Sequence, residues 1–467
     1  MATAAAAADA LGGLRTLFYG VSPREMAAAG EVPPPYIVRA IPSFLLLIVA
    51  EMAVGLAKGR KLYRANDAAV SLMQGSTQML LGFWIKGLGL GVYCWIHENM
   101  RLVRIDDAAS WPVWLACLLG VDFGYYWLHR TAHEFHVLWS AHSVHHSGED
   151  YNLATALRQG VLQPAYGWVF SLHNALFFSP TVYAHHAALN TLYQFWIHTT
   201  VIGSLGPLEY VLNTASHHRM HHRPPGNCNY AGVLIIWDVI FGTFVPEDEQ
   251  KDYYGLAKQY DTFDPVWANL EHLRRMNATL ARSSSPGPAR WLRLLTTRRV
   301  KHKWTFRPLD LFKKRPAPVR SLWDAPQPNP RRRLDGMPSA KQPVLRGYLA
   351  FLFVSATVFA VYAMQTAPTL IKHEALLAQV VCLSLFVSVG RLLDGFELGQ
   401  RVNTTRVLGF VCLSSWIVSL PVADREPTKA LVALAFECFS LVDALLWSFT
   451  YLRLWPELHH SKSARVE

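Results

Sequence analysis

The feature that most constrains this chain of 467 residues is a series of apolar segments long enough to cross a lipid bilayer. A bilayer core takes about 17–25 helical residues, and a helix satisfies its own backbone groups in hydrocarbon. Charged residues make up 16% of the chain and the mean hydropathy is +0.15, which excludes a disordered chain or a disulfide scaffold. We therefore predict an all-α, multi-pass membrane protein with about nine spans.

The expected spans cover residues 41–57, 79–96, 111–128, 161–178, 182–202, 347–364, 375–389, 407–420 and 430–452. Basic residues directly follow the first span at Lys58, Arg60 and Lys61, which places that end in the cytosol and the N-terminus in the lumen. Glu51 and Lys86 lie inside expected spans, where ionisable groups are costly, and the sequence gives neither of them a partner.

The same pattern divides the chain into five parts: a lumenal tail (1–40), N-terminal spans (41–110), a catalytic core (111–245), a basic cytosolic loop (246–343) and C-terminal spans with a tail (344–467). The start lacks the charged and apolar regions of a cleaved signal peptide. The net charge of +11 could indicate nucleic-acid binding, but the positive-inside bias explains it, so we expect no nucleic-acid partner. The sequons at Asn277 and Asn403 fall in expected cytosolic loops and should carry no glycan.

Eight of the 20 histidines fall in three short motifs: His129-x3-His133, His142-x2-His145-His146 and His218-x2-His221-His222. Residues three or four apart share one helix face, so each motif can direct two or three imidazoles at one point. Eight imidazoles exceed what one ion takes, since zinc sites close at about four ligands. We therefore predict a cytosolic cap that holds two metal ions, and all-imidazole ligation suits iron, zinc or copper.

Other residues near the motifs leave alternatives open. His198 is a further candidate ligand at the expected cytosolic end of a span, whereas His217 is more often a neighbour than a ligand. Asp122 could orient a ligand imidazole or make a simple helix-face hydrogen bond. Glu134, directly after His133, could be a carboxylate that supports a metal ligand, act as a proton relay, or lie on a solvated face.

The arrangement HxxxH…HxxHH…HxxHH between membrane segments resembles the fatty acid hydroxylase superfamily of integral-membrane di-iron oxygenases. Within that superfamily, several stretches resemble the branch that oxidises alkylglycerol ethers: residues 127–136, 142–147, 151–159, 196–199, 216–222 and 237–243. The superfamily-level match covers residues 110–245, and the four C-terminal spans resemble the same branch.

This resemblance implies two iron ions bound by the eight motif histidines and by His198, with Glu134 needed for activity. It implies O2 as co-substrate, tetrahydrobiopterin as electron donor and an endoplasmic reticulum membrane address with the site facing the cytosol. The implied substrate is an alkylglycerol or lyso-ether lipid. Hydroxylation of its ether α-carbon gives a hemiacetal, which breaks down to a fatty aldehyde and glycerol.

Three rival functions remain at this point. A sterol, sphingolipid or fatty-acyl hydroxylase or desaturase of the same superfamily would use the same metals. A His-rich metal transporter would place its site near the bilayer midplane, whereas these motifs cluster at one interface. A membrane metalloprotease would need HExxH, and the His129 motif lacks that glutamate.

Overall fold

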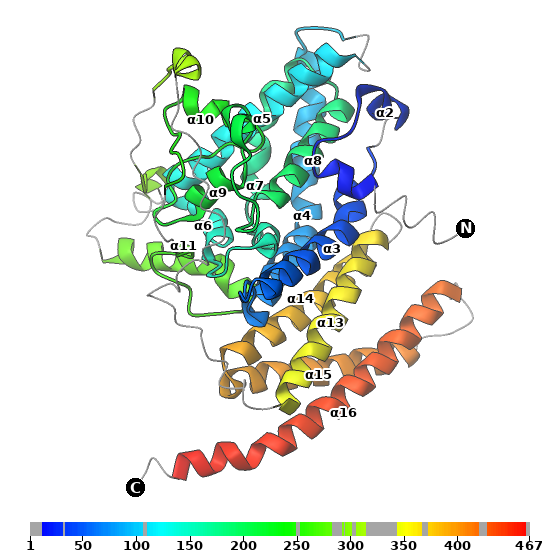
Figure 1. Cartoon of the computed structure of the whole chain (residues 1–467). Helices are drawn as coiled ribbons and strands as arrows, with labels where there is room; N and C mark the ends of the chain where they lie inside the picture. Colours follow the sequence, from blue (N-terminus) through cyan, green and yellow to red (C-terminus); the bar gives the residue numbers. More distant parts are fainter. Residues whose placement is uncertain are drawn as a thin grey trace. The chain divides into compact units, whose positions relative to one another are not determined.

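The computed structural model describes residues 12–30, 33–105, 110–248, 253–282, 292–293, 295–300, 305–313, 343–366, 372–419 and 427–463. Regular structure in these ranges is helical apart from two isolated β-bridges, so the all-α prediction is confirmed (Figure 1). The chain divides into two compact units. The first unit holds Met1–Tyr260 and Asn269–Arg332, and the second holds Asp261–Ala268 and Arg333–Glu467.

The first unit combines long helices with short α and 3-10 (η) helices. Its elements are α2 (Pro23–Ala28), α3 (Tyr36–Ala57), α4 (Ala65–Met100), α5 (Trp111–Glu134), α6 (His136–His142), η1 (His145–Ser147), η2 (Leu153–Leu157), α7 (Pro164–Gly167), η3 (Trp168–Leu176), α8 (Pro180–Trp196), η4 (Gly206–Tyr210), α9 (Ala215–His222), α10 (Ile236–Ile240) and η5 (Pro308–Phe312). The helix α11 (Pro265–Ala281) contributes residues to both units.

The second unit contains four long helices: α13 (Pro343–Thr366), α14 (Lys372–Asp394), α15 (Phe396–Ser419) and α16 (Pro427–Ser463). Each helix packs on the next one along the chain, and α13 also contacts α16. The interior holds a buried ion pair between Arg406 and Asp443, whose nitrogen and oxygen lie 2.5 Å apart. Tyr348 donates to Asp443 at 2.8 Å and accepts from Arg406, so charged and polar groups join three of the four helices.

The described chain is that of a multi-pass membrane protein. Four helical segments are long and apolar enough to cross a bilayer: Tyr36–Ala57, Pro343–Met364, Leu376–Asp394 and Leu434–Leu454. A fifth candidate is α4, whose halves Ala65–Gly82 and Gly87–Met100 meet at an angle of 53°. The expected spans over residues 111–128 and 407–420 lie in α5 and α15, which are helical but are not among these candidates. The count of nine spans is therefore not confirmed.

The prediction of a membrane helix over residues 161–178 is wrong. This stretch forms the four-residue α7 and the nine-residue 3-10 helix η3. Its polar side chains face the protein rather than lipid: Gln163 contacts His142, and the ring of His173 lies 2.9 Å from the carbonyl oxygen of Gly120. The expected partner helix over residues 182–202 forms as α8, which has 17 residues, ends at Trp196 and is not among the candidate spans.

The core that positions the site joins α5, α8 and the segment before α10. Leu118, Leu189, Leu192, Val233 and Leu234 are buried in one apolar cluster between these elements. Burial of these side chains stabilises the packing of the elements that carry the histidines.

A single carboxylate fixes the same three elements in place. Asp122 on α5 accepts from the backbone amides of Val233 and Leu234 at 2.8 Å, from Asn190 at 2.8 Å and from the indole of Trp237 at 3.1 Å. These four bonds occupy both carboxylate oxygens. Asp122 therefore joins elements of the core and does not orient an imidazole.

Candidate metal centre

The nine histidines predicted as ligands meet in two groups. We call the first the five-histidine cluster (His129, His133, His142, His146, His221) and the second the four-histidine cluster (His145, His198, His218, His222). Within each cluster one ring nitrogen per residue lies within 4.8 Å of all the others. Every one of these side chains is buried, the most accessible being His146 at 6%. Two motifs divide between the clusters: in each, the outer histidines four residues apart share a cluster and the histidine between them joins the other one.

Helix ends direct these side chains. His129 and His133 occupy the last turns of α5 with ring centroids 5.2 Å apart. The eight-residue α9 carries the third motif, and His218 and His222, four residues apart, share a face. His217, the neighbour that the sequence left open, lies outside both clusters. Its Nδ1 accepts from the backbone amide of Thr214, and it thereby caps α9.

The second ring nitrogen of five ligands is fixed by an oxygen acceptor. The Nδ1–oxygen distances are 2.8 Å for His129 to Tyr230 O, 3.0 Å for His142 to Gln163 Oε1, 3.0 Å for His145 to Arg158 O, 2.6 Å for His198 to Gln194 O and 2.8 Å for His221 to Cys228 O. An oxygen without a proton needs a donor, so Nδ1 carries the hydrogen in each neutral ring. The Nε2 lone pair of each then points into its cluster.

The short distances between Nε2 atoms of neighbouring histidines indicate that these nitrogens share a cation. They lie 2.9 Å apart in the pair His129–His142 and 3.2 Å apart in the pair His145–His198. Because neither nitrogen of a pair carries a hydrogen, the lone pairs repel unless a positive ion lies between them. Two nitrogens bound to one ion at about 2.0–2.1 Å come about 3 Å apart, which matches these pairs.

Further buried nitrogens point to the same conclusion. The Nε2 atoms of His133 and His222 are buried, and neither has a hydrogen-bond partner in the described part of the chain. A buried polar atom left unpaired costs about 1–3 kcal/mol, so an all-nitrogen cavity of this kind is unfavourable when empty. The residues present therefore fit a transition metal ion in each cluster, and imidazole ligands suit iron, zinc or copper.

Burial also keeps these rings neutral. It lowers the pKa of His142 to about 4 and the pKa of His221 to about 3, because a charged imidazolium loses its hydration in the interior. Neutral imidazole is the form that binds a metal. Both rings are thus ready to act as ligands at neutral pH.

Glu134 follows His133 of the five-histidine cluster and is buried between two arginine partners. One carboxylate oxygen accepts from Arg130 at 2.8 Å and the other accepts from Arg298 at 2.5 Å. The side chain has no exposed surface, which excludes the solvated-face alternative. The two arginines hold the carboxylate in one orientation.

Arg299 is a residue of the site that the sequence analysis missed. Its Nε donates to the carbonyl oxygen of His133 at 3.0 Å, its Nη2 donates to Asn227 at 2.6 Å, and its guanidinium stacks 4.0 Å from the ring centroid of Trp139. Burial lowers its pKa to about 10. The segment 246–343, expected to be a basic loop, thus includes α11 and a stretch that contacts the end of α5. In this stretch Arg298 forms an isolated β-bridge with Phe135, the residue after α5. No local pattern distinguishes these arginines from the others in a basic run.

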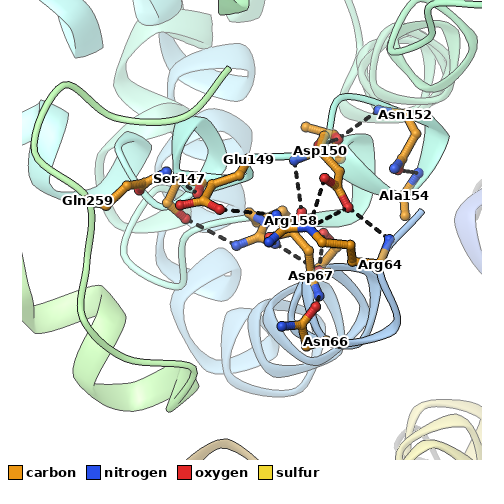
Figure 2. A network of polar contacts seen from close by, with 12 residues as sticks. Arg64, Asn66, Asp67, Ser147, Glu149, Asp150, Asn152, Ala154, Arg158 and Gln259 are labelled. Atoms are coloured by element: carbon orange, nitrogen blue, oxygen red, sulfur yellow. Dashed lines mark hydrogen bonds and ion pairs between the residues drawn. The ribbon is translucent and has the colours of Figure 1, made fainter. Parts of the chain in front are cut away.

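A network of charged and polar contacts joins the start of α4 to the loop segment 147–158 (Figure 2). Arg158 donates to the side chain of Asp67 at 2.7 Å and to Ser71 at 3.1 Å, both on α4. The carbonyl oxygen of Arg158 accepts a hydrogen bond from Nδ1 of His145. Arg64 continues the network with bonds to Asp150 at 3.0 Å. The start of α4 therefore fixes the loop that orients His145.

Glu51, which had no partner in the sequence, belongs to a second support. Its carboxylate on α3 accepts from the backbone amide of Leu153 at 2.9 Å and from the hydroxyls of Tyr63 and Thr199. Thr199 directly follows His198. The buried carboxylate therefore connects α3 to the segment that carries a ligand of the four-histidine cluster.

Comparison with known proteins identifies the family. Residues 114–243 match the family model described as fatty acid hydroxylase. An alkylglycerol monooxygenase of Danio rerio is 34% identical over 449 residues, which cover 93% of this chain and 94% of that protein. The chain belongs to the alkylglycerol monooxygenase family. Members of this family from Homo sapiens and Xenopus tropicalis are 48% and 45% identical over 266 and 265 residues.

These last two alignments cover 56% of this chain and 59% of each relative, so the similarity to them spans less than two thirds of their length. No solved structure matches the chain. The family match of residues 114–243 includes all nine clustered histidines. The family-model match and the two histidine clusters thus lie in the same part of the first unit.

Proposed function

We propose that this member of the alkylglycerol monooxygenase family is a tetrahydrobiopterin-dependent di-iron monooxygenase. Its substrates are 1-O-alkylglycerols and related lyso-ether lipids, and it hydroxylates the ether α-carbon with O2. The resulting hemiacetal breaks down to a fatty aldehyde and glycerol. The observation that carries this proposal is the pair of buried all-imidazole clusters within a chain that resembles a relative of this name along 93% of its length.

The residues of the site fit the demands of this reaction. Iron bound in the clusters would supply the oxidising power for an unactivated C–H bond. The nine neutral imidazoles would hold the metals without adding negative charge, and their burial keeps water away from the site. Glu134 is the proposed catalytic carboxylate, and Arg130 and Arg298 fix its orientation.

The membrane setting supports a division of the substrate between two phases. Glu51 connects the last turns of the candidate span α3 to the residue after His198, and Lys58 and Arg60 follow that span. By the positive-inside rule this end of α3 faces the cytosol. We therefore propose an endoplasmic reticulum enzyme whose site faces the cytosol, with the alkyl chain in lipid and the glycerol head and pterin reaching the metals from water.

The test uses the full-length chain purified in detergent. Bound iron is counted, and O2-dependent release of fatty aldehyde from a 1-O-alkylglycerol is followed with and without tetrahydrobiopterin. We expect iron in both clusters and aldehyde formation that requires the pterin. The variant His198→Ala should lose metal from the four-histidine cluster. Its matched control is His217→Ala, which removes a histidine outside both clusters. Iron without pterin-dependent aldehyde would overturn this substrate and donor and favour a sterol or acyl-lipid substrate.

A further inference from the structure

A basic cavity of about 290 Å³ lies away from the histidine clusters in the first unit. His97 and Arg101 at the end of α4, together with Arg104, form its cationic side, and Val113, Phe177 and Val182 contribute to its apolar side. None of its described lining residues is acidic. Sixteen residues of α5 separate Val113 from His129, which corresponds to about 24 Å along a helix, so the cavity is separate from the metal site.

The described residues that line this cavity carry a net positive charge. Within the described part of the chain, neither Arg101 nor Arg104 forms an ion pair with a carboxylate. The cavity also receives the N-terminal end of α8, where Ser179 is the N-cap and Pro180 opens the helix. Guanidinium groups bind phosphate in a bidentate manner, and a helix N-terminus adds partial positive charge. A phosphate group is therefore the ligand that complements the cationic side.

The surroundings place this cavity at the level of lipid headgroups. It lies at the end of Gly87–Met100, the second half of the bent candidate span. Trp95 and Trp111 flank this end with 56% and 63% of their surfaces exposed, as is typical of tryptophans at a membrane interface. An apolar wall beside a cationic side at that depth matches a phospholipid, with its phosphate on the arginines and its chains along the valine and phenylalanine residues.

We propose that this cavity is a binding site for the phosphate group of an anionic phospholipid of the surrounding membrane. Guanidinium groups beside an apolar wall bind an anionic headgroup through charge and apolar contact together. Because the site is about 24 Å from His129 along α5, the bound lipid is not the substrate but a resident of the fold. It bridges the end of α4 and the beginnings of α5 and α8, two of which carry or precede ligand histidines.

The test compares the full-length protein in nanodiscs of phosphatidylcholine alone and with phosphatidylglycerol added. Native mass spectrometry counts the retained lipids, and the thermal unfolding midpoint is measured in both compositions. We expect the wild type to retain phosphatidylglycerol and to unfold at a higher temperature in its presence. Arg101→Gln/Arg104→Gln should lose both effects while unfolding like the wild type in phosphatidylcholine, because both side chains are exposed.

The matched control is Arg293→Gln/Arg307→Gln, which removes the same charge from exposed positions elsewhere in the first unit and should behave as the wild type. Equal retention of phosphatidylglycerol by the wild type and by the Arg101/Arg104 variant would overturn the proposal. A further arm adds glycerol 3-phosphate to discs of phosphatidylcholine. An equally large rise in the unfolding midpoint there would overturn the membrane lipid as the ligand and assign the cavity to a soluble phosphate compound.

Discussion

At the scale of single residues, the orientation of the clustered imidazoles depends on hydrogen bonds made by the ring nitrogens that point away from the clusters. Five imidazoles are oriented by an oxygen on Nδ1, and four of those oxygens belong to the backbone. The exception is His142, whose Nδ1 contacts the side chain of Gln163 at 3.0 Å. This contact is the one that a substitution can remove without altering the main chain.

We expect Gln163→Ala to weaken metal binding by the five-histidine cluster about 10–100-fold, because a ligand imidazole that loses its outer hydrogen bond loses orientation and basicity. Metal content after dialysis against a graded chelator measures the effect. Gln159→Ala is the control, since Gln159 contacts only the carbonyl oxygen of Ala156 among its side-chain hydrogen bonds in the described chain. Equal metal retention by the two variants would show that Gln163 does not orient the ligand.

At the scale of elements, buried polar groups decide where helices meet. Asp122 receives four donors and so fixes the segment before α10 against α5 and α8. In the second unit, Asn403 of α15 is fully buried, donates to Tyr348 at 2.9 Å and accepts from Arg406 at 2.8 Å. Each of these side chains forms hydrogen bonds with buried groups that cannot bond to water instead.

We expect Asp122→Ala to lower the free energy of unfolding by about 3 kcal/mol or more, since it leaves two buried backbone amides unpaired at roughly 1–3 kcal/mol each. Denaturation in detergent measures this change. Asp310→Ala is the control, because it removes an ion pair with the exposed Lys313, and it should change the unfolding free energy by less than about 1 kcal/mol. Similar losses in both variants would contradict the role of Asp122.

We expect Asn403 to carry no glycan when the chain is expressed in a eukaryotic membrane. Its side-chain amide lies inside the helical interior and makes hydrogen bonds there, so a sugar would displace buried contacts. Treatment with a glycosidase should leave the electrophoretic mobility of the peptide that contains it unchanged. The expected loop position of Asn403 is wrong, since it lies within α15, and a glycan there would contradict the packing of this helix.

At the scale of the whole molecule, the chain has two units with their own interiors. All nine clustered histidines belong to the first unit. The Arg406–Asp443 pair lies within the second unit, where Arg406 is 7% exposed and Asp443 is fully buried. Damage to this pair should therefore affect one unit before the other.

We expect Arg406→Ala to destabilise the second unit by about 3–5 kcal/mol, because it leaves the buried Asp443 without its partner. The metal content of the folded protein should stay unchanged. Thermal unfolding followed by proteolysis of each unit, together with a metal count, measures both effects. Arg401→Ala changes an exposed arginine on the same helix and serves as the control. Loss of metal in Arg406→Ala alone would show that the second unit supports the metal site.

The membrane class, the all-helical fold and the nine histidines that cluster could be predicted from the sequence, because helical spacing and long apolar runs are local properties of the chain. It failed for residues 161–178, where apolar composition concealed polar side chains that bind within the protein.

Three features depend on contacts between distant segments and could not be predicted from the sequence. His145 and His146 enter different clusters, and Glu51 and Asp122 join distant elements. Arg298 and Arg299 bind beside the end of α5. These arrangements pair residues up to 166 positions apart, and the free energy that selects them comes from packing and desolvation between segments rather than from spacing within one.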